Sequence, residues 1–447
     1  MEKILFKKIS VWIVLLLAIL GIIIAILFGA SVRHYYVMGN RMLGNFGIVM
    51  VDIASVPSNI KKLITKYGLV VPNQRFEGEK GFTFNYAAGT RPDLGYLLLN
   101  RYDNDLKMSV SELVDLNTQE QIHQWRFDVN PLWDISNVES NLFDLKRDRN
   151  TKRYRNIHSY LLETGNLLTS HNVPVLKSDL CSHLTIFKDD DLYHHAIEMD
   201  ADGNFWISKF IEPKNVKLES NGKFMDDAIT LLNPDGTILF EKSIGQIFKD
   251  NGMEAMAYGG PETDDPTHLN DIQPVLKDSP YWKKGDVFIS LRNQSMLMLY
   301  RPSTNKLLWY QQGPWLHQHD VDIVDNHTIA LFNNNQTILG MKGTNQIIMY
   351  DFQSKRITKP FETAFGTLEI HTPVEGLFDL VNDNEIFVEE TLSGRLLQFD
   401  KNGSIFWQYI NRASDGKVYY VNWSRLISRG LGDKVRQKIK EVKCDEH

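Results

Sequence analysis

One phrase recurs along the chain and limits the folds open to it. Each copy has an apolar pair, a polar turn and then a segment that ends in an aromatic residue. Asp-Gly and Asn-Gly pairs in the turns favour tight hairpins, because glycine readily adopts positive φ. The phrase therefore predicts repeated β-hairpins. The clear copies are LVDLNTQEQIHQW (Leu113–Trp125), LLNPDGTILF (Leu231–Phe240), LYRPSTNKLLWY (Leu299–Tyr310) and QFDKNGSIFWQY (Gln398–Tyr409), and the weaker ones are MYDFQSKRITKPF (Met349–Phe361) and KSDLCSHLTIF (Lys177–Phe187).

The spacing of these hairpins points to one architecture. Tyr300, Tyr350 and Phe399 are corresponding positions, and about 50 residues separate each from the next, the length of a four-stranded propeller blade. A large β-sandwich is the alternative, but it gives no reason for one hairpin to recur at a constant interval. We therefore predict an all-β protein whose residues 81–412 form a β-propeller, followed by a basic helical tail over 413–447.

An uncharged apolar run, Val11–Ala30, lies near the N-terminus. As a helix it would span about 30 Å, the thickness of the hydrocarbon core of a bilayer. Lys3, Lys7 and Lys8 precede it, which places the N-terminus in the cytoplasm by the positive-inside rule.

A cleaved signal peptide is the other reading of this run. Its cleavage site needs small residues, and LFGA puts Phe28 at a position where one is required. We expect a retained signal anchor over residues 1–30 and a juxtamembrane helical segment over 31–80, with NIKKLITKYGLVV as its amphipathic part. The propeller would then lie in the periplasm or outside the cell.

Bulk composition excludes several classes of protein. The formal net charge of −6 argues against a general nucleic-acid binder. Cys181 and Cys444 are the two cysteines, one in the middle of the chain and one in the tail, so we expect neither a disulfide framework nor a Cys-x-x-Cys metal motif.

A second repeat overlies the hairpins. HAIEM begins at His195, HLNDI at His268 and HDVDI at His319, and in each an acid follows the histidine by three residues. The next copy, GLFDL, has Gly376 in the place of the histidine. The first strand of a propeller blade lines the central axis, so residues just before it would converge on one axial pocket.

A single histidine is more often a surface or packing residue than a functional one, and His194, His317 and His371 lie outside the repeat. Equivalent placement in three blades favours a shared site. Three histidines also suit zinc, but Arg292 in FISLRNQS follows His268, and a guanidinium beside a metal is unfavourable. Its planar fork instead pairs well with a tetrahedral oxyanion. Asn270 and Asn293 add neutral donors, so we expect a site for a phosphate- or sulfate-like group and no bound metal.

The run from DPTHLNDIQPV to WLHQHDVDI resembles the bacterial arylsulfotransferase family, and LYHHAIEMDADGNFWI and NDNEIFVEETLSGRLLQFDKNGSIFWQYINR extend the resemblance over most of residues 160–412. The resemblance implies a six-bladed β-propeller without a cofactor. It also implies transfer of a sulfuryl group from an aryl sulfate ester to a phenol in the periplasm, without a nucleotide donor.

By motif, the resemblance makes His319 the nucleophile that becomes sulfohistidine. His268, Arg292 and His195 would bind the sulfuryl oxygens or carry protons. Apart from the resemblance, Asp320 or Asp322 is a candidate to fix the tautomer of His319, as carboxylates do for other catalytic imidazoles, and the alternative is that either residue caps the strand. Thr391 is the candidate for a hydroxyl residue that family members have in the last blade. Better-studied members also carry a cysteine pair near the active site, whereas Cys181 is expected to have no partner in the propeller.

Two other functions remain open. One is a membrane-tethered, non-catalytic propeller that binds an anionic glycan or an aromatic sulfate, since the fold alone does not confer activity. The other is a quinone-dependent dehydrogenase, which would need a calcium site that the sequence does not reveal. Turnover of an aryl sulfate and the spectrum of a bound quinone distinguish them. The expected partners are an aryl sulfate donor, a phenolic acceptor and the membrane, and not nucleic acid.

Overall fold

The computed structural model describes residues 10–38, 43–64, 69–71, 74–133, 136, 138, 145, 149–171, 173–211, 225–258, 265–337 and 340–444. The chain forms two compact units, each of which is described by itself. One consists of Met1–Gly68 with Lys217–Gly222, and the other of Leu69–Val216 with Lys223–His447.

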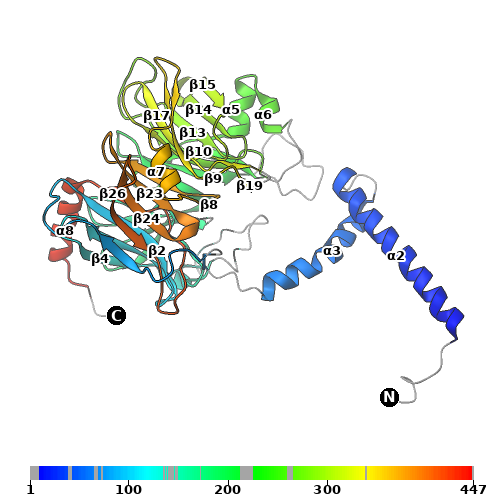
Figure 1. Cartoon of the computed structure of the whole chain (residues 1–447). Helices are drawn as coiled ribbons and strands as arrows, with labels where there is room; N and C mark the ends of the chain where they lie inside the picture. The colour runs from blue at the N-terminus through cyan, green and yellow to red at the C-terminus, as the bar shows by residue number, and fades with distance from the viewer. Residues whose placement is uncertain are drawn as a thin grey trace. The chain divides into compact units, whose positions relative to one another are not determined.

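The first unit contains two helices in its described part, α2 (Val11–Met38) and α3 (Gly44–Ile64) (Figure 1). Val11–Tyr35 is the one helix of the described residues that is long and apolar enough to cross a membrane, with a mean hydropathy of 3.3. Helix α3 falls in the segment expected to be helical. Lys3, Lys7 and Lys8, and residues 65–68 of the amphipathic piece, lie outside the described residues.

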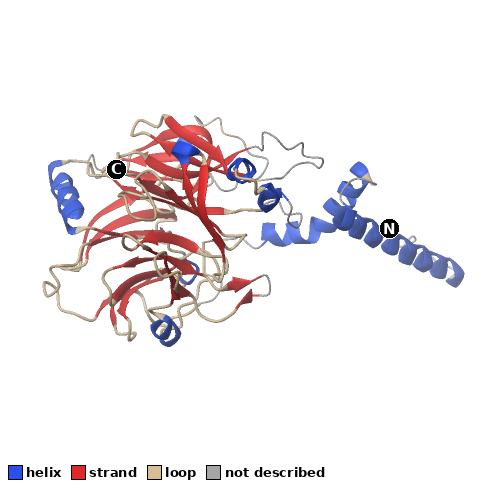
Figure 2. Ribbon diagram, turned by 90° about the horizontal axis from the view of Figure 1, so that it is seen from above, coloured by secondary structure: helices blue, strands red, loops and turns tan. Residues whose placement is uncertain are grey.

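The second unit is built of antiparallel sheets (Figure 2), and this mostly-β, propeller-like arrangement confirms the predicted fold class. In order of hydrogen-bonded neighbours, one sheet has β26 (Arg425–Ile427), β2 (Tyr96–Asp103), β3 (Met108–Asp115) and β4 (Glu120–Arg126), and a longer one has β11 (Ile238–Ser243), β10 (Asp226–Leu232), β9 (Phe205–Ile211), β8 (Leu184–Met199), β7 (Val173–Ser178), β6 (Leu167–Thr169) and β5 (Tyr160–Leu161). Two further sheets have four strands each: β12 (Leu269–Pro274), β13 (Val287–Leu291), β14 (Met296–Arg301) and β15 (Lys306–Gln312) in one, and β16 (His319–Ile323), β17 (Thr328–Asn333), β20 (Gln346–Asp351) and β21 (Ile357–Thr358) in the other. The remaining strands form a sheet of β1 (Gly81–Phe84), β25 (Ile405–Ile410), β24 (Arg395–Asp400), β23 (Glu385–Glu390) and β22 (Leu377–Leu380), and a pair of β18 (Gln336–Thr337) and β19 (Gly340–Met341).

Short helices connect or flank these sheets. The described ones are α5 (Ile244–Asp250), α6 (Glu254–Tyr258), α7 (Glu362–Thr367), α8 (Arg429–Glu441) and the 3-10 turns η1 (Asn130–Leu132), η2 (Pro302–Thr304) and η3 (Thr391–Ser393).

Each hairpin predicted from the recurring phrase is present. The pairs are β3–β4, β10–β11, β14–β15, β24–β25, β20–β21 and β7–β8. Gly236 and Gly403 take φ of 86° in their turns, as the Asp-Gly and Asn-Gly pairs require. Strand β13 is buried along its whole length, whereas β15 alternates between half-buried and exposed positions, as an outer strand does.

One strand joins two of these hairpins into a single seven-stranded sheet. Residues 184–188 of β8 pair with β7, and residues 193–199 pair with β9. The sheet order suits the six blades implied by the resemblance if β8 is counted in two of them, and the blade number stays a prediction.

The C-terminal stretch after residue 412, expected as a helical tail, contributes a strand as well as a helix. β26 pairs with β2 and becomes the first strand of the sheet that holds β3 and β4. Helix α8 follows directly and packs on that sheet through Val435, which is fully buried beside Tyr96. Arg429 and Arg436 of α8 both bind the Asp115 carboxylate at 3.0 Å.

The expectation of no disulfide was wrong. Cys181 and Cys444 form a disulfide with a Cα–Cα distance of 5.3 Å, across a sequence separation of 263 residues. Cys181 lies in the β7–β8 turn, and Cys444 lies just after α8. The bond fastens the tail to a distant hairpin, which spacing in the sequence did not reveal.

Candidate active site

The histidine repeat marks a shared backbone position. His195, His268 and Gly376 each have positive φ and stand at the head of a first strand, and in the β16 copy Asp320 takes the positive φ. The first strands β8, β12, β16 and β22 lie next to one another in this order. The residues at their heads therefore gather at one place.

Two further members of this set escaped the sequence repeat. His158 precedes β5 with φ of 49°, and Trp423 precedes β26 with φ of 60°. The Trp423 indole lies 5.4 Å from the His158 ring and 5.9 Å from the rings of both His195 and His319. The segment WSRLI at Trp423 lacks both the histidine and the acid three residues later, so the repeat could not have found the tryptophan.

The three predicted histidines come together in the structure. The His195 and His268 rings are 5.2 Å apart, and Trp423 contacts both His195 and His319. His319 is 1% exposed, so it is buried within the site rather than placed on an open rim.

His319 is held by an amide. Its Nδ1 donates to Asn334 Oδ1 at 2.6 Å, while Asn334 Nδ2 donates to the Thr372 and Glu375 carbonyls. Burial, followed by the charge of Arg292, lowers the pKa of His319 to about 3. The imidazole is therefore neutral near pH 7.

A carboxylate holds His268. Its Nδ1 lies 2.5 Å from Asp265 Oδ2, and its backbone N–H donates to Asp265 Oδ1 at 3.0 Å. The side chain of His268 is 27% exposed. It is therefore more accessible than the side chain of His319.

His195 is held by another histidine. Its Nδ1 lies 2.6 Å from Nδ1 of His194, and the His194 ring stacks on Phe210. Burial, followed by the neighbouring histidines, lowers the pKa of His195 well below its ordinary value. His195 is therefore neutral as well.

Arg292 lies next to His268 and is hydrogen-bonded to its backbone. Its backbone N–H donates to the His268 carbonyl at 3.0 Å, and its Nη1 donates to Asn293 Oδ1 at 2.7 Å. Its charge lowers the pKa of both His319 and His317. Arg292 thus supplies a positive charge near the imidazoles of His319 and His317.

The three residues expected to bind substrate make internal hydrogen bonds. Asn293 Nδ2 donates to the Asp265 carbonyl, and Asn270 Nδ2 donates to the Gln318 carbonyl, next to His319. Thr391 Oγ1 donates to Glu389, whose carboxylate also accepts the Trp423 and Ser424 N–H groups. All three residues support groups of the site, and their contact with substrate stays a prediction.

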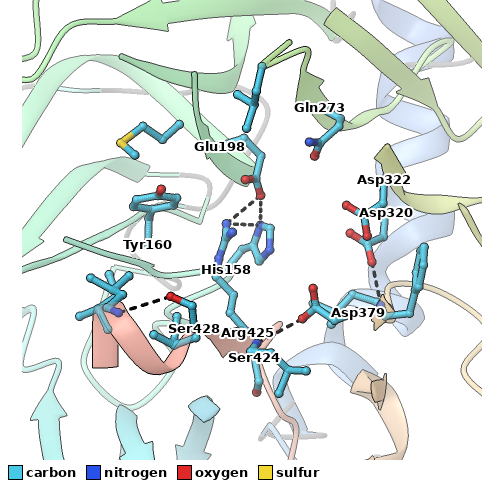
Figure 3. Close-up of a pocket in the computed structure, with 18 residues that line it drawn as sticks. His158, Tyr160, Glu198, Gln273, Asp320, Asp322, Asp379, Ser424, Arg425 and Ser428 are labelled. Carbon is cyan, nitrogen blue, oxygen red and sulfur yellow. Dashed lines mark hydrogen bonds and ion pairs between the residues drawn. The ribbon is translucent and has the colours of Figure 1, made fainter. Parts of the chain in front are cut away.

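Behind the histidines lies a layer of carboxylates. Glu198, Asp271, Asp322 and Asp379 are the acids that follow the repeat positions by three residues. Glu198, Asp322 and Asp379 line a cavity of about 310 Å³ together with Asp320 and Arg425 (Figure 3). Arg425 binds Glu198 at 2.9 Å and donates to His158 Nδ1.

The expected role of Asp320 or Asp322 in holding His319 was wrong. Asp320 Oδ2 accepts the Phe378 N–H at 2.7 Å, and both aspartates face the cavity of Figure 3. Asp320 follows His319 directly, but a β-bulge at this point turns its side chain to the carboxylate layer. Asn334, from the end of β17, takes the expected role.

The described residues contain no group of three or more histidine, cysteine, aspartate or glutamate side chains that could hold a metal ion. The rings of His195 and His268 contact each other, and those of His158 and His195 contact Trp423.

Comparison with known proteins gives one informative match. A family model described as arylsulfotransferase (ASST) matches residues 161–412, more than half of the chain, and confirms the resemblance. A search of the curated proteins finds no match.

Solved structures are similar only at a low level. TolB from Acinetobacter baumannii has 7% identity and a TM-score of 0.42, with 74% of this chain and 66% of that chain covered, just under two thirds of TolB. A chain of a nidogen/laminin complex has 9% identity and a TM-score of 0.42, with 75% and 100% covered. Streptogramin B lyase has 12% identity and a TM-score of 0.36, with 78% and 98% covered. We draw no argument from these likenesses.

Proposed function

Because this chain belongs to the arylsulfotransferase family, we propose that it transfers a sulfuryl group from an aryl sulfate ester to a phenolic acceptor through a sulfohistidine on His319. The observation that carries the proposal is a buried, neutral imidazole beside a guanidinium and two further histidines. A neutral imidazole is a good nucleophile near pH 7.

The neighbours of His319 suit the charge of a sulfuryl group. Arg292 presents a fork of N–H donors that pairs with two oxygens of a tetrahedral anion. His195 and His268, whose rings lie 5.2 Å apart, supply ring nitrogens that carry protons or bind the sulfuryl oxygens. The Arg292 fork stabilises charge that develops during transfer, and the loss of such a donor typically costs about 3 kcal/mol of transition-state stabilisation.

We place the catalytic unit outside the cytoplasm, held to the membrane by α2. Helix α2 is long and apolar enough to act as an anchor, although a signal sequence has the same properties. The Cys181–Cys444 disulfide supports this location, because disulfides persist in oxidising compartments such as the periplasm.

The test uses the full chain in detergent with 4-nitrophenyl sulfate and a phenol. We expect release of nitrophenolate and formation of the sulfated phenol. In protein quenched during turnover, the His319 peptide should gain the mass of a sulfuryl group. His319→Asn should lower the rate at least about a thousandfold, the scale expected when a covalent route is removed.

His327→Asn is the matched control, because His327 lies in the turn at the far end of the same β16–β17 hairpin. It should keep wild-type activity. Binding of the donor without any turnover would overturn the proposal and favour a binding propeller.

A further inference from the structure

Two histidines of the site are held by groups of different charge. His319 Nδ1 meets the neutral amide of Asn334 at 2.6 Å, and His268 Nδ1 meets the carboxylate of Asp265 at 2.5 Å. The two partners, Asn334 and Asp265, lie outside the histidine repeat.

The orientation of the Asn334 amide is fixed by its other partners. Asn334 Nδ2 donates to the Thr372 carbonyl at 3.1 Å and to the Glu375 carbonyl at 2.6 Å. Both partners are acceptors, so the amide oxygen must face His319. The proton of neutral His319 therefore lies on Nδ1, and Nε2 carries the free electron pair.

An amide oxygen accepts a proton from imidazole but does not neutralise an imidazolium. Among the charges near His319, Arg292 disfavours a second cation, and the opposing effect of Glu375 is smaller. The nearby Glu375 carboxylate is already bound by Arg155 at 2.8 and 2.9 Å. His319 is thus kept neutral with one reactive nitrogen.

Asp265 provides a different environment. A carboxylate only accepts hydrogen bonds, so Nδ1 of His268 carries a proton and points at a carboxylate, the arrangement found in other histidines that transfer protons in catalysis. The Asn293 side chain donates to the Asp265 carbonyl and keeps this loop beside Arg292.

We propose that Asn334 and Asp265 are positioning residues that divide the work between two histidines, with His319 as nucleophile through Nε2 and His268 as the acid and base through Nε2. The proposal rests on the proposed function. It does not give His195 the acid role, because Nδ1 of His195 lies 2.6 Å from a histidine ring and not from a carboxylate.

The chemistry balances as follows. The electron pair on His319 Nε2 attacks sulfur, the bond between sulfur and the aryl oxygen breaks, and its electron pair leaves on that oxygen, which takes the Nε2 proton of His268. The acceptor phenol then gives its proton to His268 Nε2, and its oxygen attacks sulfur. The N–S bond breaks, and its electron pair returns to His319.

The separate roles of His319 and His268 can be tested by changing the acidity of the phenol that leaves. A phenolate from phenyl sulfate has a conjugate acid with a pKa of about 10 and needs a proton as it leaves. The far more acidic 4-nitrophenol leaves readily as its anion. Single-turnover release of phenol or nitrophenolate, measured on the full chain without acceptor, isolates this first step.

We expect Asp265→Asn and His268→Asn to slow release from phenyl sulfate by about a hundredfold, the usual contribution of general acid catalysis. Release from 4-nitrophenyl sulfate should change little. The double variant should be no slower than His268→Asn alone, because Asp265 acts through His268. Equal slowing of both donors would overturn the assignment of His268 as the acid.

Asp179→Asn is the matched control, because Asp179 holds His183 at 3.0 Å in an exposed turn away from the site. It should leave both donors unaffected. Asn334→Leu, which removes the acceptor at similar size, should slow both donors alike, because it disturbs the nucleophile.

The tautomer of His319 can be measured separately from activity. In ¹⁵N-histidine-labelled full chain, the signal lost in His319→Asn should show a protonated Nδ1 in the wild type and a mixture of tautomers in Asn334→Leu. A His319 protonated on Nε2 would overturn the role of Asn334. This measurement needs no turnover, so it separates failure of the inference from failure of the proposed function.

Discussion

The indole of Trp423 lies 5.9 Å from the imidazole of His319, with the two rings nearly perpendicular at 86°. The same indole contacts His195 and His158, so one aromatic side chain supports three of the gathered histidines. Trp423 belongs to the segment that leads into β26, and its backbone is held by Glu389.

We predict that Trp423→Phe lowers kcat on 4-nitrophenyl sulfate and that its effect on Tm is no larger than that of the same substitution elsewhere in the core. Phenylalanine leaves a gap in contact with the histidines, which then lose their fixed positions. Trp125→Phe is the matched control, since both tryptophans are fully buried with an indole N–H that has no partner among the described residues. The two variants should lower Tm similarly, and only Trp423→Phe should lower kcat. Equal activity of the two variants would show that Trp423 has no special role.

The rate on 4-nitrophenyl sulfate should stay nearly flat between about pH 5 and about pH 8. Burial lowers the pKa of His319 to about 3, so the nucleophile is neutral throughout this range. The charged or titratable groups that act on it are Arg292, His268 and Glu375. The kcat/KM profile checks this prediction, and a fall in rate near pH 6.5, the ordinary histidine value, would contradict it.

Asp379 should make stability fall as pH rises. Burial raises its pKa from 3.8 to about 6, so the folded protein holds this proton more tightly than the unfolded chain does. The resulting stability is complete below about pH 4 and is lost as pH rises through 6. Glu198, Asp320, Asp322 and Arg425 line the same cavity.

Asp379→Asn should therefore raise Tm by a few degrees at about pH 8, raise it by less at about pH 5, and change it little below about pH 4. The asparagine oxygen can still accept the Leu426 N–H that Asp379 accepts at 3.2 Å. Asp383→Asn, in an exposed turn of the same sheet, is the control and should not alter the pH dependence of Tm.

Cys444→Ser should lower the free energy of unfolding by about 2–5 kcal/mol, because the disulfide restricts the unfolded chain over a long loop. The wild type treated with a reductant should show the same loss in thermal unfolding. A reductant should then have no further effect on the variant. An unchanged Tm in the variant would mean that the bond does not stabilise this unit.

Local patterns in the sequence were enough to predict the hairpins. Turn residues and apolar alternation act over a few neighbours, so copies such as LLNPDGTILF reveal their pairing directly. The histidine repeat likewise predicted three of the histidines that gather, His195, His268 and His319, because equivalent positions in a repeated sheet occupy equivalent places, but it did not predict His158.

Partners from distant segments were not predictable in this way. Asn334 is one of three consecutive asparagines, and nothing local indicates which one reaches His319. Asp320 adjoins His319 in sequence, yet a bulge directs it elsewhere. The pairing of Cys181 with Cys444 and the place of Trp423 depend on closure of the sheet by β26, which is a property of the whole chain.

That closure also affects how the protein is made. Ser424, at the head of β26, accepts the backbone N–H of Asn100 with its hydroxyl oxygen, across 324 residues of sequence, and Trp423 stands beside it. A ribosome therefore completes the sheet of β2 only after every other described strand has been synthesised. Until then a nascent or truncated chain lacks Trp423, which contacts its histidines. The proposed sulfuryl transfer would therefore be confined to molecules in which β26 has been synthesised and exported.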